Sequence, residues 1–275
     1  MIKRTASSIV LVLTVIAFFL LRTVNYKLFD ILVYGIAITC TIELLRAYKD
    51  GVSKLLKILI LIFTITVFPV MSLIPQVIIQ FVTAYVSLLV FVCVLTNGLD
   101  KKDGLFKVVF ATFYPTIPLL SMVLLNIQGG SGIYFLVTAL AIPAFTDVGA
   151  YLLGSKIKGP KLCPSISPNK TISGAIGGLI CGVIATLVTY FSLTALNINV
   201  FGERNIITVV IFLITSGIFL SVIAQVGDLV ESYIKRRLDI KDMGNIIPGH
   251  GGMLDRVDGL AFTALFTYVL YSIVL

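Results

Sequence analysis

The sequence predicts an all-α polytopic membrane protein with about nine transmembrane helices. Of its 275 residues, 58% are hydrophobic and only 12% are charged, and the mean hydropathy is +1.08. Ordinary soluble proteins are about 25% charged, so this composition excludes a soluble globule. The apolar runs reach the length of about 20 residues that a helix needs to cross the hydrocarbon core.

Polar or helix-breaking residues separate the apolar runs. Pro69 and Pro75 mark a short connection between the third and fourth runs, and Gly129 and Gly130 separate the fifth from the sixth. The N-terminal run has the positive start of a signal peptide, but no small-residue cleavage site follows it, so we expect a retained first helix. The nine expected spans are residues 8–25, 28–47, 55–75, 77–96, 105–126, 132–153, 173–196, 206–231 and 259–275.

The positions of the basic residues support this count, because they gather on one side of the expected bilayer. With nine spans, 18 of the 21 lysines and arginines fall on the side of the N-terminus, and only Arg22, Lys27 and Arg204 fall on the other. The side rich in lysine and arginine faces the cytoplasm. We therefore expect a cytoplasmic N-terminus, a C-terminus outside, and two long cytoplasmic loops at residues 154–172 and 232–258.

The polar motifs divide the chain into two regions. Residues 1–126 contain N-terminal transmembrane helices without such motifs, whereas residues 127–275 contain a C-terminal transmembrane region with both long loops. Most of the net charge of +8 is explained by the topology and by attraction to anionic lipid headgroups, whereas some basic residues are placed more specifically, in the polar motifs. We therefore expect the lipid bilayer, and no nucleic acid, as a partner.

Two polar stretches precede the longest loop. Asp147, in "AFTDVGAYLLG", lies within the sixth apolar run, where an ionisable residue is costly and is a functional candidate by default. A structural ion pair near the helix end is the alternative. In "SPNKTISG", Thr171 or Ser173 can cap the next helix, which would place Lys170 beside a helix N-terminus, a natural anion site. A simple inside-positive charge explains Lys170 equally well.

The third stretch, residues 221–259, is the richest in polar residues. If the eighth span continues as a helix beyond the membrane, Gln225, Asp228, Ser232 and Lys235 share one face, since they are three or four residues apart. The turn at residues 248–252, "PGHGG", can bring backbone N–H groups close to a ligand.

The charges of this stretch suit a phosphoryl-transfer site. Asp255 and Asp258, three residues apart at the start of the ninth span, offer with Asp228 the oxygen ligands that Mg²⁺ prefers. Neighbouring lysines and arginines suit phosphate oxygens. The single histidine, His250, has no evident nucleophile partner, so we interpret it as a hydrogen-bonding ligand and not as a general base.

Residues 232–258, "SYIKRRLDIKDMGNIIPGHGGMLDRVD", closely resemble the signature of the phosphatidate cytidylyltransferases, or CDP-diacylglycerol synthases. That signature runs Ser-x-x-Lys-Arg, Lys-Asp, Pro-Gly-His-Gly-Gly and Asp-Arg-x-Asp, and each of these residues is present here at matching spacing. "DVGAYLLG", "SPNKT" and "QVGDLVES" also resemble the family. The resemblance covers residues 146–259, and the N-terminal spans match only in being apolar.

The resemblance implies the transfer of CMP from CTP to phosphatidic acid, which forms CDP-diacylglycerol and pyrophosphate for phospholipid biosynthesis. It also implies Mg²⁺, a homodimer in the cell membrane, and a polar cavity open to the cytoplasm and to lipid. The residues carried over as catalytic are Asp228, Lys235, Asp255 and Asp258, of which the three aspartates are the expected metal ligands. Those carried over as substrate-binding are Asp147, Lys170, Ser232, Arg236, Lys241, His250 and Arg256.

The chain departs from the family pattern at three positions. Where the family reads Ser-Pro-Lys-Lys-Thr-x-Glu-Gly, Asn169 replaces a lysine and Ser173 replaces a glutamate, and Gly259 stands where serine is common. The change at Ser173 predicts that Lys170 lacks a partner. The aspartates of the main signature are unaffected, so we expect activity, with a lower rate or an altered lipid or nucleotide preference as a hypothesis.

Two other functions are compatible with parts of this pattern. A CTP-dependent polyprenol or lipid kinase would use the same nucleotide on a similar apolar scaffold, and would release CDP. A secondary transporter would also place acids within its spans, but transporters often contain internal repeats with broken helices in corresponding positions. The polar motifs lie in the second half of the chain alone, which argues against such a repeat.

Overall fold

A computed structural model describes residues 2–49, 52–97, 102–198 and 200–274. Within these residues, eight helices are long and apolar enough to cross a membrane, and a shorter apolar helix spans Ile9–Leu21. Each expected span overlaps helix within these residues, so the predicted all-α polytopic fold is confirmed. The side that each terminus faces stays a prediction, and Lys101, one of the counted basic residues, lies outside the described residues.

The chain divides into two compact units, residues 1–120 with 240–255 and residues 121–239 with 256–275. The predicted division after residue 126 was based on where the polar motifs lie and not on packing, so it stays a prediction. The helices of the first unit are α1 (Ile2–Leu21), α2 (Tyr26–Ala47), α3 (Lys54–Leu73), the 3-10 helix η1 (Pro75–Val77), α4 (Ile78–Asn97), α5 (Lys102–Phe113) and the start of α6 (Thr116–Ile127).

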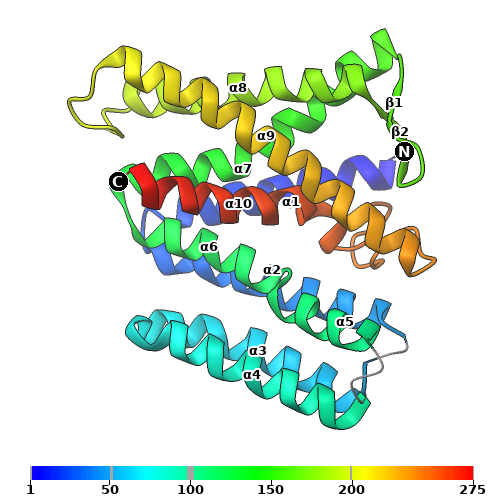
Figure 1. The fold of residues 1–275 in the computed structure, drawn as a ribbon. Helices are drawn as coiled ribbons and strands as arrows, with labels where there is room; N and C mark the ends of the chain where they lie inside the picture. Colours follow the sequence, from blue (N-terminus) through cyan, green and yellow to red (C-terminus); the bar gives the residue numbers. More distant parts are fainter. Residues whose placement is uncertain (1, 50–51, 98–101, 199, 275) are drawn as a thin grey trace. The chain divides into compact units, whose positions relative to one another are not determined.

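The first unit is built around α3. This helix packs against α2, α4 and α5, and Figure 1 shows α3 and α4 side by side. Leu56, Ile60 and Phe63 of α3 are fully buried, as is Cys40 of α2. Residues 240–255 join these helices through hydrogen bonds to the Glu43 carboxylate of α2.

The expected fifth span, residues 105–126, is confirmed as an apolar span, Asp103–Ile127, but it is not one continuous helix. It is divided into α5 and α6 at Tyr114 and Pro115. Proline has no N–H for the helical hydrogen bond, and its ring displaces the carbonyl four residues earlier. The two helices together still provide an apolar stretch of 25 residues.

The second unit is a helical layer with a small hairpin. Besides the end of α6, its elements are α7 (Gly130–Ile157), β1 (Lys161–Cys163), β2 (Ser167–Thr171), α8 (Ile172–Ala195), α9 (Ile206–Arg237) and most of α10 (Leu254–Val274). α8 packs against both α7 and α9, and Figure 1 shows α8 and α9 side by side. β1 and β2 pair antiparallel, with Lys161 opposite Thr171. This hairpin was not predicted, since residues 154–172 were expected to form a loop.

Helices α9 and α10 extend beyond their predicted bounds. α9 continues to Arg237, so the residues of its polar face remain helical, as the sequence analysis required. α10 begins at Leu254 and not near residue 259. This earlier start places Asp255 in the first helical turn, where negative charge stabilises the unpaired N–H groups.

Glycines allow α7 and α8 to pack backbone against backbone. A Cβ atom on Gly149 of α7 would lie 2.6 Å from the Cys181 Sγ atom and would also overlap the Gly177 carbonyl oxygen of α8. The backbone of α8 cannot rotate out of the way as a flexible side chain can. The close approach therefore depends on glycine.

We expect Gly149→Val to destabilise the protein by about 1–3 kcal/mol, the usual cost of overpacking a core. The measurement is the thermal unfolding midpoint in detergent. Gly35→Val in α2 is the matched control, because no atom lies within 4 Å of its Cβ position. Equal midpoints for the two variants would contradict the proposed tight packing.

Candidate active site

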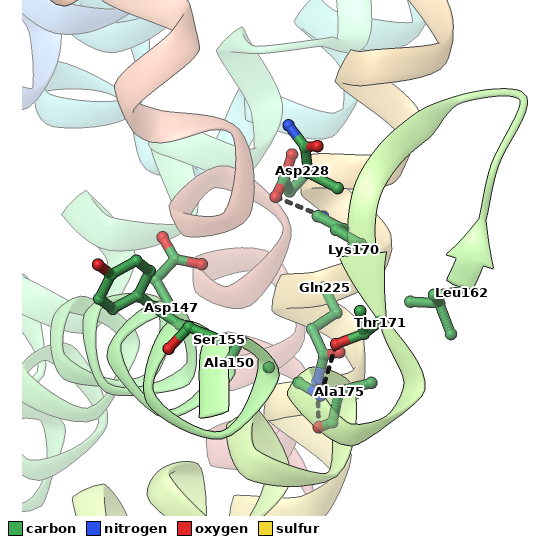
Figure 2. Close-up of a pocket in the computed structure, with 13 residues that line it drawn as sticks. Asp147, Ala150, Ser155, Leu162, Lys170, Thr171, Ala175, Gln225 and Asp228 are labelled. Atoms are coloured by element: carbon green, nitrogen blue, oxygen red, sulfur yellow. Dashed lines mark hydrogen bonds and ion pairs between the residues drawn. The ribbon is translucent and has the colours of Figure 1, made fainter. Parts of the chain in front are cut away.

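The second unit contains a pocket of about 360 Å³ between α7, the β hairpin, α8 and α9. This volume falls in the range of about 300–1,000 Å³ that is usual for small-molecule sites. Figure 2 shows its polar side chains converging from these elements. The polar residues that line it are Asp147, Tyr151, Ser155, Asn169, Lys170, Thr171, Gln225 and Asp228.

α9 contributes Gln225 and Asp228, which line the pocket from one face of the helix. The Gln225 Nε2 atom donates to the Ala175 carbonyl oxygen of α8 at 3.3 Å, which fixes the amide against the neighbouring helix. One turn further along, the Ser232 hydroxyl donates to Asp228 Oδ1 at 3.3 Å. The shared face predicted for Gln225, Asp228 and Ser232 therefore exists, and Ser232 supports Asp228.

Lys170 enters the pocket from β2. Thr171 caps α8 by accepting a hydrogen bond from the Gly174 N–H at 3.1 Å, so Lys170 directly precedes the helix, as predicted. The Lys170 Nζ atom forms an ion pair with Asp228 Oδ2 (Figure 2). The expectation that Lys170 lacks a partner is therefore wrong. Its partner comes from α9, and the replacement at Ser173 does not leave it alone.

Ser173 has a local structural role. Its hydroxyl donates to the Lys158 carbonyl oxygen and lies 3.1 Å from the Thr171 hydroxyl. These contacts tie the end of α7 to the start of α8. Gly259 lies close to α9, because a Cβ atom there would be 3.2 Å from the Ala224 carbonyl oxygen.

Three carboxylates of the second unit lie near one another. Asp147 of α7 lines the pocket, and it is close enough to Asp228 and Asp258 for their negative charges to repel. The positive charges that act on it are those of Lys170 and Arg256. Acidic groups from three helices and cationic side chains therefore lie together in the second unit.

A second ion pair lies further along α9. The Lys235 Nζ atom lies 3.5 Å from Oε1 of Glu231, whose side chain is fully buried, and Glu231 also lies beside Asp258. Glu231 is not among the predicted site residues. Its spacing of four residues from Lys235 was the available signal. Arg236 is directed to the hairpin, where its Nε atom donates to the Ile166 carbonyl oxygen at 3.5 Å.

Three further predicted site residues belong to the first unit. Lys241 and His250 lie on residues 241–253, here called the signature loop, and Asp255 lies two residues after it. Asp255 is buried, and its Oδ2 atom accepts hydrogen bonds from the Gly252 N–H at 2.7 Å and the Met243 N–H at 2.9 Å. Lys241 is exposed and His250 is half-buried. One oxygen of the predicted metal ligand Asp255 is therefore engaged in shaping the loop.

Backbone bonds close the turn that contains His250. The His250 N–H donates to the Ile247 carbonyl oxygen at 3.0 Å, and the Ile247 N–H donates to the Gly251 carbonyl oxygen at 2.9 Å. Gly249 and Gly251 have φ angles of 80° and 85°. Residues with a Cβ atom rarely adopt this region, so the turn requires glycine at both positions.

Glu43 of α2 is a residue that the sequence analysis missed. It is 2% exposed, and its carboxylate accepts hydrogen bonds from the N–H groups of Met253 and Leu254. The available signal was an acidic residue inside the second apolar run. Its partners could not be predicted, because 210 residues separate Glu43 from Met253.

The carboxylates of the second unit fit Mg²⁺ as part of a ligand set that substrate phosphates complete. Among the residues that the structure describes, no group of three or more His, Cys, Asp or Glu side chains could hold a metal ion alone. Mg²⁺, however, is usually held by one or two carboxylates together with substrate phosphates. One or two of the neighbouring Asp147, Asp228 and Asp258 could supply that number.

Comparisons with known proteins agree with the sequence motifs. A family model described as the Cytidylyltransferase family matches residues 2–274. The chain is 43% identical over 142 residues to a phosphatidate cytidylyltransferase of Bacillus subtilis (strain 168). These 142 residues are 52% of this chain and 49% of the relative. Identity to the enzyme of the same name from Brucella melitensis is 40% over 161 residues, 58% of this chain and 55% of the relative. The chain spans about half the length of the curated relatives that it matches.

Proposed function

Because the chain belongs to the cytidylyltransferase family, we propose that it transfers CMP from CTP to phosphatidic acid, forming CDP-diacylglycerol and pyrophosphate. The observation that carries this proposal is the pocket in which Lys170 and Asp228 pair beside Asp147. A nucleoside triphosphate with its metal needs both kinds of charge, cations for phosphate oxygens and carboxylates for the metal.

The reaction needs little acid–base chemistry. The phosphate monoester of phosphatidic acid is largely dianionic at neutral pH, as its second pKa is near ~6 by comparison with phosphorylated side chains. One of its oxygens attacks the α-phosphorus of CTP, a new P–O bond forms, and the bond to the β-phosphate oxygen breaks to release pyrophosphate. The protein contributes positioning and charge neutralisation, which dominate phosphoryl-transfer catalysis.

The side chains of the second unit take defined roles in this proposal. Asp228 and Asp258 would hold Mg²⁺, with Asp147 near both. When bound, the ion offsets the charge of the triphosphate and of the departing pyrophosphate. Lys170, released from its ion pair with Asp228, binds a phosphate group, and Ser232 orients the Asp228 carboxylate. Metal ligation by Asp255 and phosphate contacts of Lys235, Arg236, Lys241, His250 and Arg256 stay predictions from the signature.

We further propose that this site faces the cytoplasm and that the protein acts as a homodimer in the cell membrane. The asymmetry of basic residues supports the first statement, and the family resemblance supports the second. Accessibility labelling of a cysteine placed at Lys161, on the exposed hairpin, tests the sidedness. The mass of the detergent-purified protein tests the dimer.

The function is tested by pyrophosphate release from CTP in detergent. Release is expected to require phosphatidic acid and a divalent metal, to stop when EDTA removes the metal and to resume with Mg²⁺. Diacylglycerol in place of phosphatidic acid is the matched control, since it lacks the attacking phosphate. Formation of CDP with a lipid alcohol would favour the kinase instead, and absence of CTP consumption by folded protein would favour a transporter.

A further inference from the structure

We propose that Glu43 is a positioning residue that sets the shape of the signature loop for catalysis. This inference rests on the proposed function for its catalytic consequence. Its structural part, the dependence of the loop on Glu43, stands on the contacts alone. Glu43 lies in the N-terminal half, where the family signature has no counterpart.

The Glu43 carboxylate binds the backbone at the point where the signature loop becomes α10. Oε1 accepts from the Met253 N–H at 3.0 Å, and Oε2 accepts from the Leu254 N–H at 2.9 Å. These donors belong to the start of a helix, where backbone N–H groups lack helical partners and negative charge is favoured. A carboxylate offers one oxygen to each of these donors and adds a negative charge, whereas a glutamine amide has a single acceptor oxygen and would turn its NH₂ group toward the other donor.

The loop also encloses this carboxylate closely. A Cβ atom on Gly252 would lie 2.5 Å from Glu43 Oε2, and one on Gly244 would overlap Oε1. The two glycines belong to opposite ends of the loop, and both backbones pass directly beside the same side chain. Glu43 is therefore a fixed point around which the loop closes.

The adjacent Asp255 completes the arrangement. Its Oδ2 atom accepts hydrogen bonds from the N–H groups of Met243 and Gly252. Met243 directly precedes Gly244, and Gly252 itself contacts Glu43. Two buried carboxylates, one from α2 and one from α10, thus hold both ends of the loop. Burying a charge is costly unless it is hydrogen-bonded, and an apolar side chain could fill the same space. We infer that the carboxylate serves loop geometry more than packing.

The first experiment compares Glu43→Gln with Thr41→Val. The amide keeps the size of Glu43 but has a single acceptor oxygen, so one loop N–H loses its partner. Thr41 lies on the same helix, and its hydroxyl is buried near those of Thr64 and Thr116, so its change also removes a buried polar contact but does not touch the loop. We expect faster hydrogen–deuterium exchange in residues 241–255 for Glu43→Gln alone.

The catalytic consequence is a lower kcat with a smaller change in KM. Displacing a catalytic loop by about 1 Å can cost about 100-fold in rate, so we expect kcat of Glu43→Gln to fall by about 10- to 100-fold. The KM for CTP is expected to change less than kcat, because Glu43→Gln removes none of the side chains proposed to contact phosphate, Lys170 of the pocket and Lys241 and His250 of the loop. A purely structural role would lower the amount of folded enzyme and leave the turnover of the folded fraction unchanged.

Gly244→Ala provides an independent test with Glu43 intact. Its Cβ atom would displace the carboxylate from the loop side, so the same exchange and rate changes are expected. Gly35→Ala in α2, with no atom within 4 Å, is its control. Unchanged loop exchange in both Glu43→Gln and Gly244→Ala overturns the inference. A wild-type protein that releases no pyrophosphate, with faster loop exchange in the variants, overturns the proposed function and leaves the loop dependence standing.

Discussion

Asp228→Asn is expected to lower kcat for pyrophosphate release by about 1,000-fold, at the upper end of the effect of removing one preorganised electrostatic group. Asn has the same size but no charge, so the variant cannot hold Mg²⁺ as the carboxylate does. It also removes the negative partner of Lys170 and weakens the hydrogen bond from Ser232. Steady-state kinetics with saturating CTP and phosphatidic acid measure the change.

The control for this variant is Asp239→Asn, which removes the same charge just beyond the end of α9. Asp239 is exposed and has a φ angle of 53°, a conformation that asparagine adopts readily. Its kcat is expected to stay within about twofold of wild type, as for surface changes away from the site. A loss of less than tenfold in Asp228→Asn, with full activity in Asp239→Asn, would exclude Asp228 as a metal ligand.

The transmembrane helices could be predicted because the bilayer imposes a length on each apolar run. Proline positions were less informative. Pro69 and Pro143 lie inside α3 and α7, whereas Pro115 separates α5 from α6. Neighbouring helices can satisfy the backbone groups that a proline frees within a membrane protein. Which proline ends a helix therefore depends on packing, which the sequence alone does not reveal.

The site residues were predictable where neighbours in sequence are neighbours in space. Ser232 and Asp228 meet because they are four residues apart on α9. The ion pair between Lys170 and Asp228 joins a hairpin to a helix, and the hairpin strands are only three and five residues long. Glu43 reaches its donors across 210 residues. Such contacts are set by the fold and have no local pattern.

The ion pair between Lys170 and Asp228 raises the question whether Lys170 serves structure or substrate. Its side chain is 26% exposed and that of Asp228 is 31% exposed. Ion pairs with this access to water contribute about 0–1 kcal/mol to stability. Stability alone is therefore a weak reason for a lysine at this position, whereas a triphosphate gives a strong one.

We therefore expect Lys170→Met to reduce kcat/KM for CTP by about 100-fold, as for the loss of a charged contact to a buried phosphate. The unfolding midpoint is expected to change little. Lys161→Met is the matched control, because Lys161 is exposed on the paired strand of the same hairpin. It removes an equal charge outside the pocket and should leave kcat/KM within about twofold of wild type.

Exchanging the two charges separates the two roles of Lys170. The double variant Lys170→Asp with Asp228→Lys can re-form an ion pair, but it places a carboxylate where the phosphate contact is needed and a cation where the metal is needed. If the pair were structural, the exchange would restore the activity lost in each single variant. We expect its unfolding midpoint to stay close to that of wild type and the variant to remain inactive, because a triphosphate with its metal distinguishes the two positions by the sign of their charge.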